Sequence, residues 1–339
     1  MKQGILVYAP SWIGDAVISL GALRVLRAAR PEARIVVLTR PWVRELYEGV
    51  ECIDGVLDYE PHARDRGVTG FVRAAARIAR ERFDASLVLP NAFRAAALIL
   101  AARIGERWGY ATEGRGLLLT RSIPPAPRPF GRHQAHYYLD LMSGLGFDVV
   151  SEPDLHLVAS DRARRRANAL LEAEGWDGRP LIGVHPGATN SRAKVWSPLR
   201  FAEAARRLAQ ARDGRVVVLG GPSDRELCEQ VRSSLGGDCI ALHGKTSLGE
   251  LIGVLDRLAI VLTNDSGPMH IAAALGTPTL AVFGPTDPRE TGPVGEKAGV
   301  VREPVDCSPC LFRDCPIDHR CMDHVFPSRV VAEAEALLA

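Results

Sequence analysis

The stretch IVLTNDSGPMHIAAAL, residues 260–275, contains a short apolar run, a polar turn and the start of a helical pattern in immediate succession. The run Ile260–Asn264 has the length and composition of a strand that is buried on both faces of a parallel sheet. The segment Pro268–Leu275 predicts a helix, because proline is favoured in the first helical turn. A strand, turn and helix in this order form the repeating unit of a doubly wound α/β domain.

The turn within this stretch has the chemistry of a ligand site. Ser266 and Gly267 place free backbone N–H groups at the predicted helix N-terminus, where anions bind readily. Asp265 stands beside them and could accept hydrogen bonds from sugar hydroxyls. His270 follows one turn into the helix, where a structural hydrogen bond and a ligand contact are both open. Ligands of open parallel sheets bind beyond the carboxyl ends of the strands, so this turn is a candidate site.

The same unit recurs on both sides of this stretch and predicts two domains. In the first half we expect strands at Gly4–Pro10, Ile35–Thr39, Val56–Tyr59 and Ser86–Pro90, and helices at Gly14–Arg30, Phe71–Arg82, Phe93–Ile104 and His133–Gly144. In the second half we expect further strands at Leu181–His185, Val216–Gly220, Ile240–His243 and Leu280–Phe283, and helices at Pro198–Arg212, Asp224–Leu235, Leu248–Leu258 and Ser328–Leu338. The Pro-rich segment Ser122–Arg132 is expected to be an irregular loop. A composition shift over Val149–Asp161 predicts an N-terminal domain of residues 1–155, a C-terminal domain of residues 156–325 and a final helix within 326–339.

Composition excludes several classes of protein. The chain has 339 residues and a formal net charge of +2, without the long basic runs of a nucleic-acid-binding tail. The apolar run Ile5–Tyr8 near the N-terminus is too short for a signal-peptide core, and no stretch is long enough for a spanning helix. We therefore expect a cytoplasmic protein that does not bind nucleic acid.

A second candidate site follows the first predicted strand, at Tyr8–Ala16. A dinucleotide fingerprint would need Gly-x-Gly-x-x-Gly here, and its absence argues against a nicotinamide enzyme. Instead Asp15 stands at the start of a helix. It could complement the helix dipole or act as a general base facing a cleft, and its position alone leaves both roles open.

Two loops in the second half also follow predicted strands. The segment from His185 to Trp196 contains Thr189 and Lys194, whose hydroxyl and ammonium groups can donate to phosphate. The next loop contains two glycines followed by Asp224, which could hold ribose hydroxyls or cap the following helix. Glu226 lies close enough to be considered for the ribose as well.

Taken together, these motifs resemble the family of ADP-heptose–lipopolysaccharide heptosyltransferases, glycosyltransferase family 9, along the whole chain. The resemblance is carried by Gly14-Asp15-Ala16, Lys194-Val195-Trp196, the segment Asn264–His270 and the cysteine-rich segment Cys307–Met322. It implies a GT-B fold, with an N-terminal acceptor domain, a C-terminal donor domain and a cleft between them. It also implies an inverting transfer of heptose from ADP-L-glycero-D-manno-heptose to heptosyl-Kdo2-lipid A, with no metal and no cofactor.

The resemblance also implies roles for particular residues. Asp15 resembles the catalytic base, and Lys194 resembles the lysine that binds the diphosphate. Thr189, Ser266 and Gly267 resemble further phosphate contacts, while Asp265 falls where the heptose hydroxyls are held. The expected donor-binding set is completed by Asp224 and His270, and Ser11 is expected to line the acceptor pocket.

Arginines are concentrated in the proposed acceptor domain. Residues 61–135 contain 13 arginines and only five acidic residues, a field that would steer a phosphorylated acceptor. The alternative is a set of arginines that merely solvate helix faces. The candidates for direct contact are Arg64, Arg66, Arg94, Arg121, Arg128 and Arg132. Such an acceptor is lipid-linked, so we expect peripheral contact with the cytoplasmic face of the inner membrane.

Four cysteines form the pattern Cys307-x2-Cys310-x4-Cys315-x5-Cys321, and the chain has seven in all. The spacing contains only one CxxC pair, so it permits either a structural metal site or a reduced loop. The resemblance does not require a metal.

Rival functions differ in testable ways. A family 9 transferase with another acceptor or nucleotide sugar would keep the same loops. A nucleotide-sugar epimerase would not need a basic acceptor domain, and a binding protein would not need the carboxylates Asp15 and Asp265.

Overall fold

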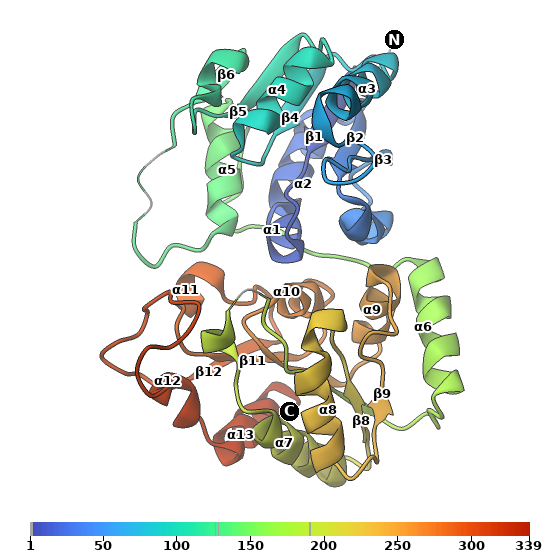
Figure 1. Cartoon of the computed structure of the whole chain (residues 1–339), viewed down its shortest axis with the longest axis vertical. Coiled ribbons are helices and arrows are strands. Elements are labelled where there is room, and N and C mark those ends of the chain that lie inside the picture. Colours follow the sequence, from blue (N-terminus) through green and yellow to red (C-terminus); the bar gives the residue numbers. More distant parts are fainter. Residues whose placement is uncertain (1–2, 126, 128, 190) are drawn as a thin grey trace. The chain divides into compact units, whose positions relative to one another are not determined.

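The computed structural model describes residues 3–125, 127, 129–189 and 191–339, and it divides into two compact units. The first unit ends at Leu155 and the second begins at His156. Each unit contains one six-stranded sheet in which all neighbouring strands are parallel (Figure 1). The fold class predicted from the sequence, α/β with two doubly wound domains, is confirmed.

The N-terminal sheet has the order β3-β2-β1-β4-β5-β6. Its strands are β1 (Gly4–Tyr8), β2 (Arg34–Thr39), β3 (Gly55–Asp58), β4 (Ala85–Val88), β5 (Glu106–Tyr110) and β6 (Arg121–Ile123). Its helices are α1 (Ile13–Ile18), α2 (Leu20–Ala29), α3 (Gly67–Arg80), α4 (Phe93–Ala101) and α5 (Ala135–Gly144), with 3₁₀ turns η1 (Pro41–Gly49) and η2 (Arg115–Leu118). The strand order reverses between β1 and β4, which is where such sheets bind ligands.

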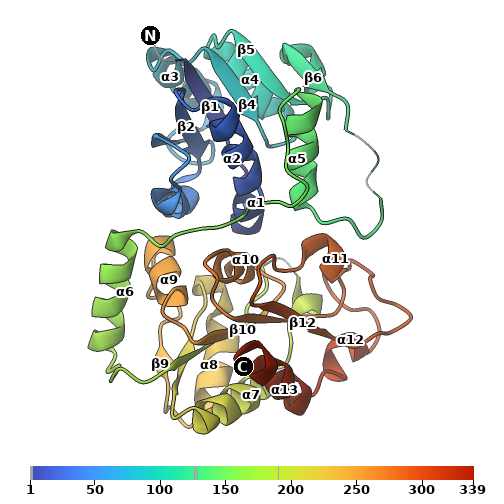
Figure 2. The same cartoon turned by 180° about the vertical axis from the view of Figure 1, so that it is seen from behind.

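Alternate side chains along the strands of this domain face opposite sides of the sheet, and a separate layer of helices covers each side. Leu6 and Tyr8 of β1 cluster with Ala74 and Ile78 of α3 and with buried residues of α4. Helices α2 and α5 pack together on the other face (Figures 1 and 2). Both faces of every central strand are thus covered, which explains the continuous apolar runs in the sequence.

The C-terminal sheet has the order β12-β11-β10-β7-β8-β9. Its strands are β7 (Leu181–His185), β8 (Arg215–Val218), β9 (Ile240–Ala241), β10 (Ile260–Asn264), β11 (Thr279–Phe283) and β12 (Ala298–Arg302). Its helices are α6 (Asp161–Ala173), α7 (Pro198–Ala211), α8 (Arg225–Ser234), α9 (Leu248–Leu255), α10 (Gly267–Ala274), α11 (Pro288–Thr291), α12 (Arg320–Asp323) and α13 (Pro327–Leu337), with 3₁₀ turns η3 (Arg192–Lys194) and η4 (Pro222–Asp224). Helix α13 packs against α7 and β12, and α6 lies beside α9 (Figure 2).

The structure corrects several local predictions. The segment expected to be an irregular loop begins with β6, a three-residue edge strand whose side chains are mostly exposed and therefore show no apolar pattern. Strands β5 and β12 and helix α6 were not predicted. Strand β5 begins with two charged residues, β12 buries only Val301, and the buried stripe of α6 consists of two alanines and Leu171 among charged residues. The helix predicted over Gly14–Arg30 is interrupted at Ser19, whose hydroxyl donates to the Ala16 carbonyl at 2.8 Å.

Candidate active site

The loop that contains Lys194 is tied at both ends by one buried side chain. Asn264, the last residue of β10, is fully buried and donates to the Pro186 carbonyl at 2.7 Å. Its Oδ1 accepts a hydrogen bond from the backbone N–H of Trp196 at 3.0 Å. The Trp196 indole in turn donates to the Val325 carbonyl at 3.0 Å. The loop after β7 is therefore brought back to the carboxyl edge of the sheet, and Lys194 is placed beside the turn that precedes α10.

Lys194 and Asp265 form an ion pair at this edge. The distance from Lys194 Nζ to Asp265 Oδ2 is 2.7 Å, and the Thr286 hydroxyl donates to the same carboxylate oxygen at 2.8 Å. The Asp265 side chain is 7% exposed, whereas that of Lys194 is 25% exposed. The ammonium group can therefore exchange its partner for an incoming anion while Thr286 keeps the carboxylate in place.

The turn before α10 leaves its helix start open to a ligand. Ser266 occupies the N-cap position, but its side chain makes no capping hydrogen bond. Its hydroxyl instead lies 3.2 Å from Thr263 Oγ1 and 3.4 Å from Nδ1 of His185. Burial lowers the pKa of His185, so this imidazole is neutral at pH 7. The amides at Gly267 and beyond, together with the helix dipole, favour a negatively charged group here.

A pocket of about 700 Å³ opens beside the same loops, and two carboxylates in its lining differ in how far they are available to a ligand. Asp224 lines it, but its Oδ2 accepts from the Gly221 N–H at 2.9 Å and lies 3.8 Å from His185 Nε2. Asp224 also packs so tightly on Gly187 that a Cβ there would lie 2.3 Å from the Asp224 carboxyl carbon. Glu226 lines the same pocket, is exposed, and forms no hydrogen bond or ion pair with any residue that the structure describes. Its carboxylate is the one available to a ligand.

The remaining predicted donor residues lie around this centre. Thr189 is exposed and lines the pocket, and Asn190 of the same loop falls outside the described residues. His270 is 7% exposed within α10, so its side chain is largely enclosed by the domain.

The cysteine-rich segment Cys307–Met322 is hydrogen-bonded to the loop that contains Lys194. The backbone N–H of Ala193 donates to the Arg313 carbonyl at 2.9 Å, and the His319 imidazole lies 2.7 Å from the Ala193 carbonyl oxygen. An exposed ion pair joins Arg192 and Asp314 at 2.6 Å. The segment thus supports the residue immediately before Lys194.

The thiols themselves are all free in the structure. Burial, followed by the neighbouring thiols of Cys307, Cys310 and Cys315, raises the pKa of Cys321 to about 11, so it is protonated at neutral pH. Within the described ranges, no three His, Cys, Asp or Glu side chains are grouped so that they could hold a metal ion.

Asp15 and Ser11 lie at the carboxyl end of β1 in the N-terminal domain. Asp15 occupies the first turn of α1 and is half-buried. The Ser11 hydroxyl accepts from Nε of Arg40 at 3.3 Å, and Arg40 directly follows β2. The Arg40 guanidinium lies over the rings of Trp42 and Tyr59, at 5.7 and 5.5 Å from their centroids.

Arg94 approaches the same tyrosine from α4. Its Nε donates to the Tyr59 hydroxyl at 3.2 Å, and its guanidinium lies 5.0 Å from the centroid of the Phe71 ring. Neither Arg94 nor Arg40 forms an ion pair with a residue in the described part of the chain. Two uncompensated cations therefore lie at the ligand-binding edge of this sheet.

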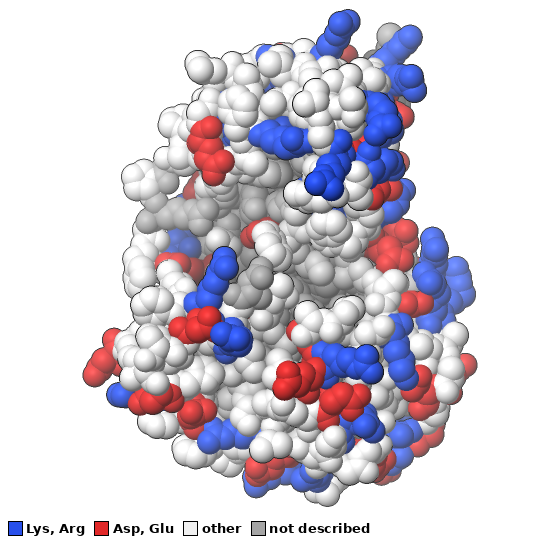
Figure 3. Space-filling view, viewed as in Figure 1, with Lys and Arg blue, Asp and Glu red and all other residues white. Residues whose placement is uncertain are grey.

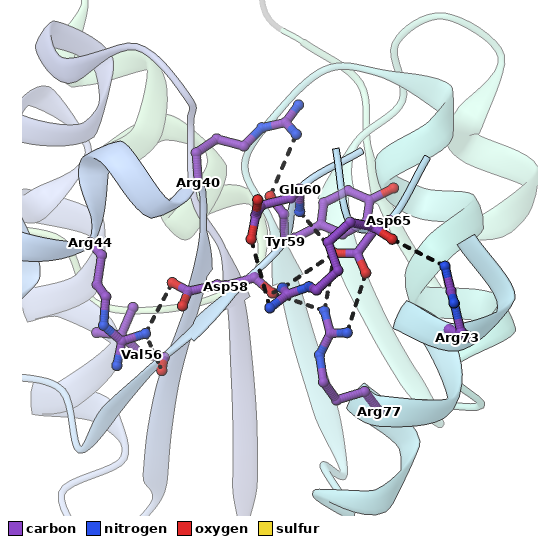
Figure 4. A network of polar contacts seen from close by, with 10 residues as sticks. Arg40, Arg44, Val56, Asp58, Tyr59, Glu60, Asp65, Arg73 and Arg77 are labelled. Atoms are coloured by element: carbon purple, nitrogen blue, oxygen red, sulfur yellow. Dashed lines mark hydrogen bonds and ion pairs between the residues drawn. The ribbon is translucent and has the colours of Figure 1, made fainter. Parts of the chain in front are cut away.

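The other predicted arginines are already engaged. Arg64 Nη2 lies 3.4 Å from Oδ2 of Asp65, a carboxylate that is 1% exposed. Figure 4 shows Arg77 at the same carboxylate. Arg132 donates from both of its terminal nitrogens to Asp140, one of these bonds measuring 2.9 Å. An acceptor role for either Arg64 or Arg132 would require these partners to be exchanged. The remaining candidates are placed as follows: Arg66 is exposed, Arg121 donates to the Leu145 carbonyl, and Arg128 lies outside the described residues.

Three residues of this arrangement were missed by sequence reasoning. Arg40 directly follows a predicted strand, and Asn264 is the last residue of another. The rule that ligands bind beyond the carboxyl ends of parallel strands could therefore have found both. Thr286 lies three residues beyond β11, and no local pattern indicates that its hydroxyl reaches Asp265.

Solved structures share this architecture. The structure of ADP-heptose lps heptosyltransferase II from Escherichia coli matches with a TM-score of 0.82 at 28% identity, covering 100% of this chain and 98% of that chain. A family 9 glycosyl transferase from Veillonella parvula shares the fold with a TM-score of 0.89 at 24% identity, covering 100% of this chain and 98% of that chain. Two doubly wound domains, with a lysine and an open helix start at the strand ends of the second, define a glycosyltransferase of the GT-B class.

Sequence comparison narrows this class to a family. The model of glycosyltransferase family 9 (heptosyltransferase) matches residues 71–320. Lipopolysaccharide heptosyltransferase 2 of Salmonella typhimurium is 31% identical, covering 99% of this chain and 98% of the relative. The protein of that name from Escherichia coli is 30% identical, covering 98% of each. The chain belongs to glycosyltransferase family 9, which confirms the resemblance inferred from its motifs.

Proposed function

We propose that the protein transfers heptose from ADP-L-glycero-D-manno-heptose to heptosyl-Kdo2-lipid A during synthesis of the lipopolysaccharide core. The observation that supports the donor is the Lys194–Asp265 pair beside the open start of α10, which joins a cation, backbone amides and a carboxylate at one strand edge. The names of the relatives indicate heptose as the sugar.

In the proposed donor complex, the diphosphate displaces Asp265 from Lys194 and also meets the amides at Ser266 and Gly267. Asp265 then accepts hydrogen bonds from the heptose hydroxyls while Thr286 holds its second lone pair. The pocket beside η4 takes the ribose, with Glu226 better placed than Asp224 because Asp224 already holds Gly221.

The acceptor is proposed to bind the N-terminal domain at Ser11, Arg40 and Arg94. Arginine pairs well with phosphate and carboxylate, and both guanidinium groups lack a carboxylate partner among the described residues. Their aromatic supports fix them at the end of the sheet that also presents Asp15.

The proposed reaction is a single displacement with inversion. Asp15 takes the proton of the acceptor hydroxyl while that oxygen bonds to the anomeric carbon, and the bond from this carbon to the diphosphate oxygen breaks. The electron pair leaves with ADP, whose growing negative charge is stabilised by Lys194 and the amides of α10. These residues supply the positive charge that the leaving group needs, so we propose that the protein uses no cofactor beyond its donor.

The test is incubation with ADP-heptose and the one-heptose acceptor, read by mass spectrometry for a gain of one heptose. Asp15→Asn should abolish the gain while ADP-heptose still binds, because the amide cannot accept the proton. Asp148→Asn, an exposed aspartate of the same domain, is the matched control. Near wild-type turnover by Asp15→Asn would refute the base assignment, and transfer from a different nucleotide sugar in a donor panel would refute the donor.

A further inference from the structure

The exposed face of α3 carries an apolar stripe that the domain does not use. Ala74 and Ile78 of this helix pack into the core of the N-terminal domain. On the opposite side Val68, Val72 and Ala76 recur every four residues, a spacing that aligns them along the helix. Val68 is 80% exposed and Val72 is 58% exposed.

A basic stripe runs beside the apolar one. Arg66 just before α3, and Arg73 and Arg80 within it, recur every seven residues and are exposed. None of the three forms an ion pair with a described residue. The nearby carboxylate of Asp65 cannot neutralise them, because it is buried and already paired with Arg64 and Arg77. Figure 3 shows lysine and arginine side chains gathered over the region of α3.

We propose that this face of α3 seats the N-terminal domain on an anionic phospholipid surface. Protruding valines beside arginines that form no ion pair with a described residue match the requirements of an interfacial helix, which inserts apolar side chains among the headgroups and contacts their phosphates with cations. No helix in the described residues is long and apolar enough to cross a membrane, so this contact is peripheral. The inference rests on the proposed function in one respect: a lipid-linked acceptor lies in such a surface.

Sedimentation of the full chain with acceptor-free vesicles tests the proposal directly. The protein should bind vesicles of phosphatidylcholine mixed with phosphatidylglycerol, release at high salt, and bind phosphatidylcholine alone only weakly. Each of Arg66→Gln, Arg73→Gln and Arg80→Gln should weaken binding about fivefold, since one arginine near an anionic surface contributes about that factor. Arg165→Gln, at an exposed and unpaired arginine of α6, is the charge-matched control and should leave binding unchanged.

The apolar stripe has its own control. Val68→Asp combined with Val72→Asp should abolish vesicle binding, whereas Leu117→Asp, at a residue 96% exposed elsewhere on the same domain, should not. Equal binding to neutral and anionic vesicles, or equal loss in the Leu117 control, would overturn the proposal.

A soluble acceptor separates this proposal from the proposed function. The variants at Arg73 and Arg80 and the double valine variant should transfer heptose to an acceptor without acyl chains at the wild-type rate, and should lose rate only on vesicle-embedded acceptor. Loss of rate on both acceptors would show that α3 acts in catalysis and overturn the membrane role. Failure of the wild-type protein to transfer at all would refute the proposed function, while vesicle binding would still decide the role of α3.

Discussion

The substitution Thr286→Val isolates a single hydrogen bond in the proposed donor site. Thr286 is 8% exposed, and its hydroxyl donates to Asp265 Oδ2 at 2.8 Å. Valine has nearly the same shape, so the change removes the donor without opening a cavity. A hydrogen bond to a charged group contributes about 1.5–3 kcal/mol. Lys194 Nζ also lies 2.7 Å from this oxygen, so the lower end of that range applies, which is about tenfold in affinity or rate.

The assay compares sugar transfer with nucleotide binding. kcat/KM for ADP-heptose should fall about tenfold, because Asp265 is no longer aimed at the heptose hydroxyls. ADP has no heptose, so its dissociation constant by calorimetry should stay within about twofold of wild type. Thr286→Ser keeps the hydroxyl and should restore most of the activity. Unchanged kcat/KM in Thr286→Val, or an equal loss of ADP affinity, would refute this role for Thr286.

Three further predictions test other parts of the structure. Lys194→Ala should weaken ADP binding by about tenfold or more in calorimetry, since a charged contact to the diphosphate is lost, and an unaltered affinity would count against the lysine. Arg40→Gln should raise KM for the acceptor while Arg132→Gln should not, because only Arg132 is already engaged by a carboxylate; equal effects in steady-state assays would contradict that distinction. Asp65→Asn should lower the free energy of unfolding by about 3 kcal/mol at pH 7, measured by urea denaturation. Burial raises the pKa of Asp65, but hydrogen bonds from Arg77, the Glu60 amide and Arg64 together outweigh it and hold this pKa below its usual value. The stabilisation is therefore complete above the unfolded pKa of about 4 and is lost as the pH falls through the lower folded pKa. The difference in free energy of unfolding between wild type and Asp65→Asn should accordingly disappear in acid. A difference that stayed constant with pH would contradict the stabilising role of these ion pairs.

The amino-acid sequence alone determined the strands of both sheet centres and the loops that follow them. Ile260–Asn264 and Leu181–His185 were predicted at their observed bounds, because a strand covered on both faces is apolar over most of its length. The carboxyl ends of parallel strands share one edge, so Lys194 and Asp265 could be assigned to one site before any contact was known. The family motifs then supplied their expected roles.

Only the tertiary structure decided which of these side chains are available. The sequence does not distinguish Arg64 from Arg94. In the structure Arg64 is paired with the buried carboxylate of Asp65, whereas Arg94 donates to the Tyr59 hydroxyl and has no carboxylate partner among the described residues. The physical reason is that the deciding contacts join different elements: Arg94 of α4 reaches Tyr59 after β3, and Arg77 of α3 reaches Asp65 in the preceding loop. The link from Thr286 to Asp265 depends on where two adjacent strands end, and no local periodicity encodes it.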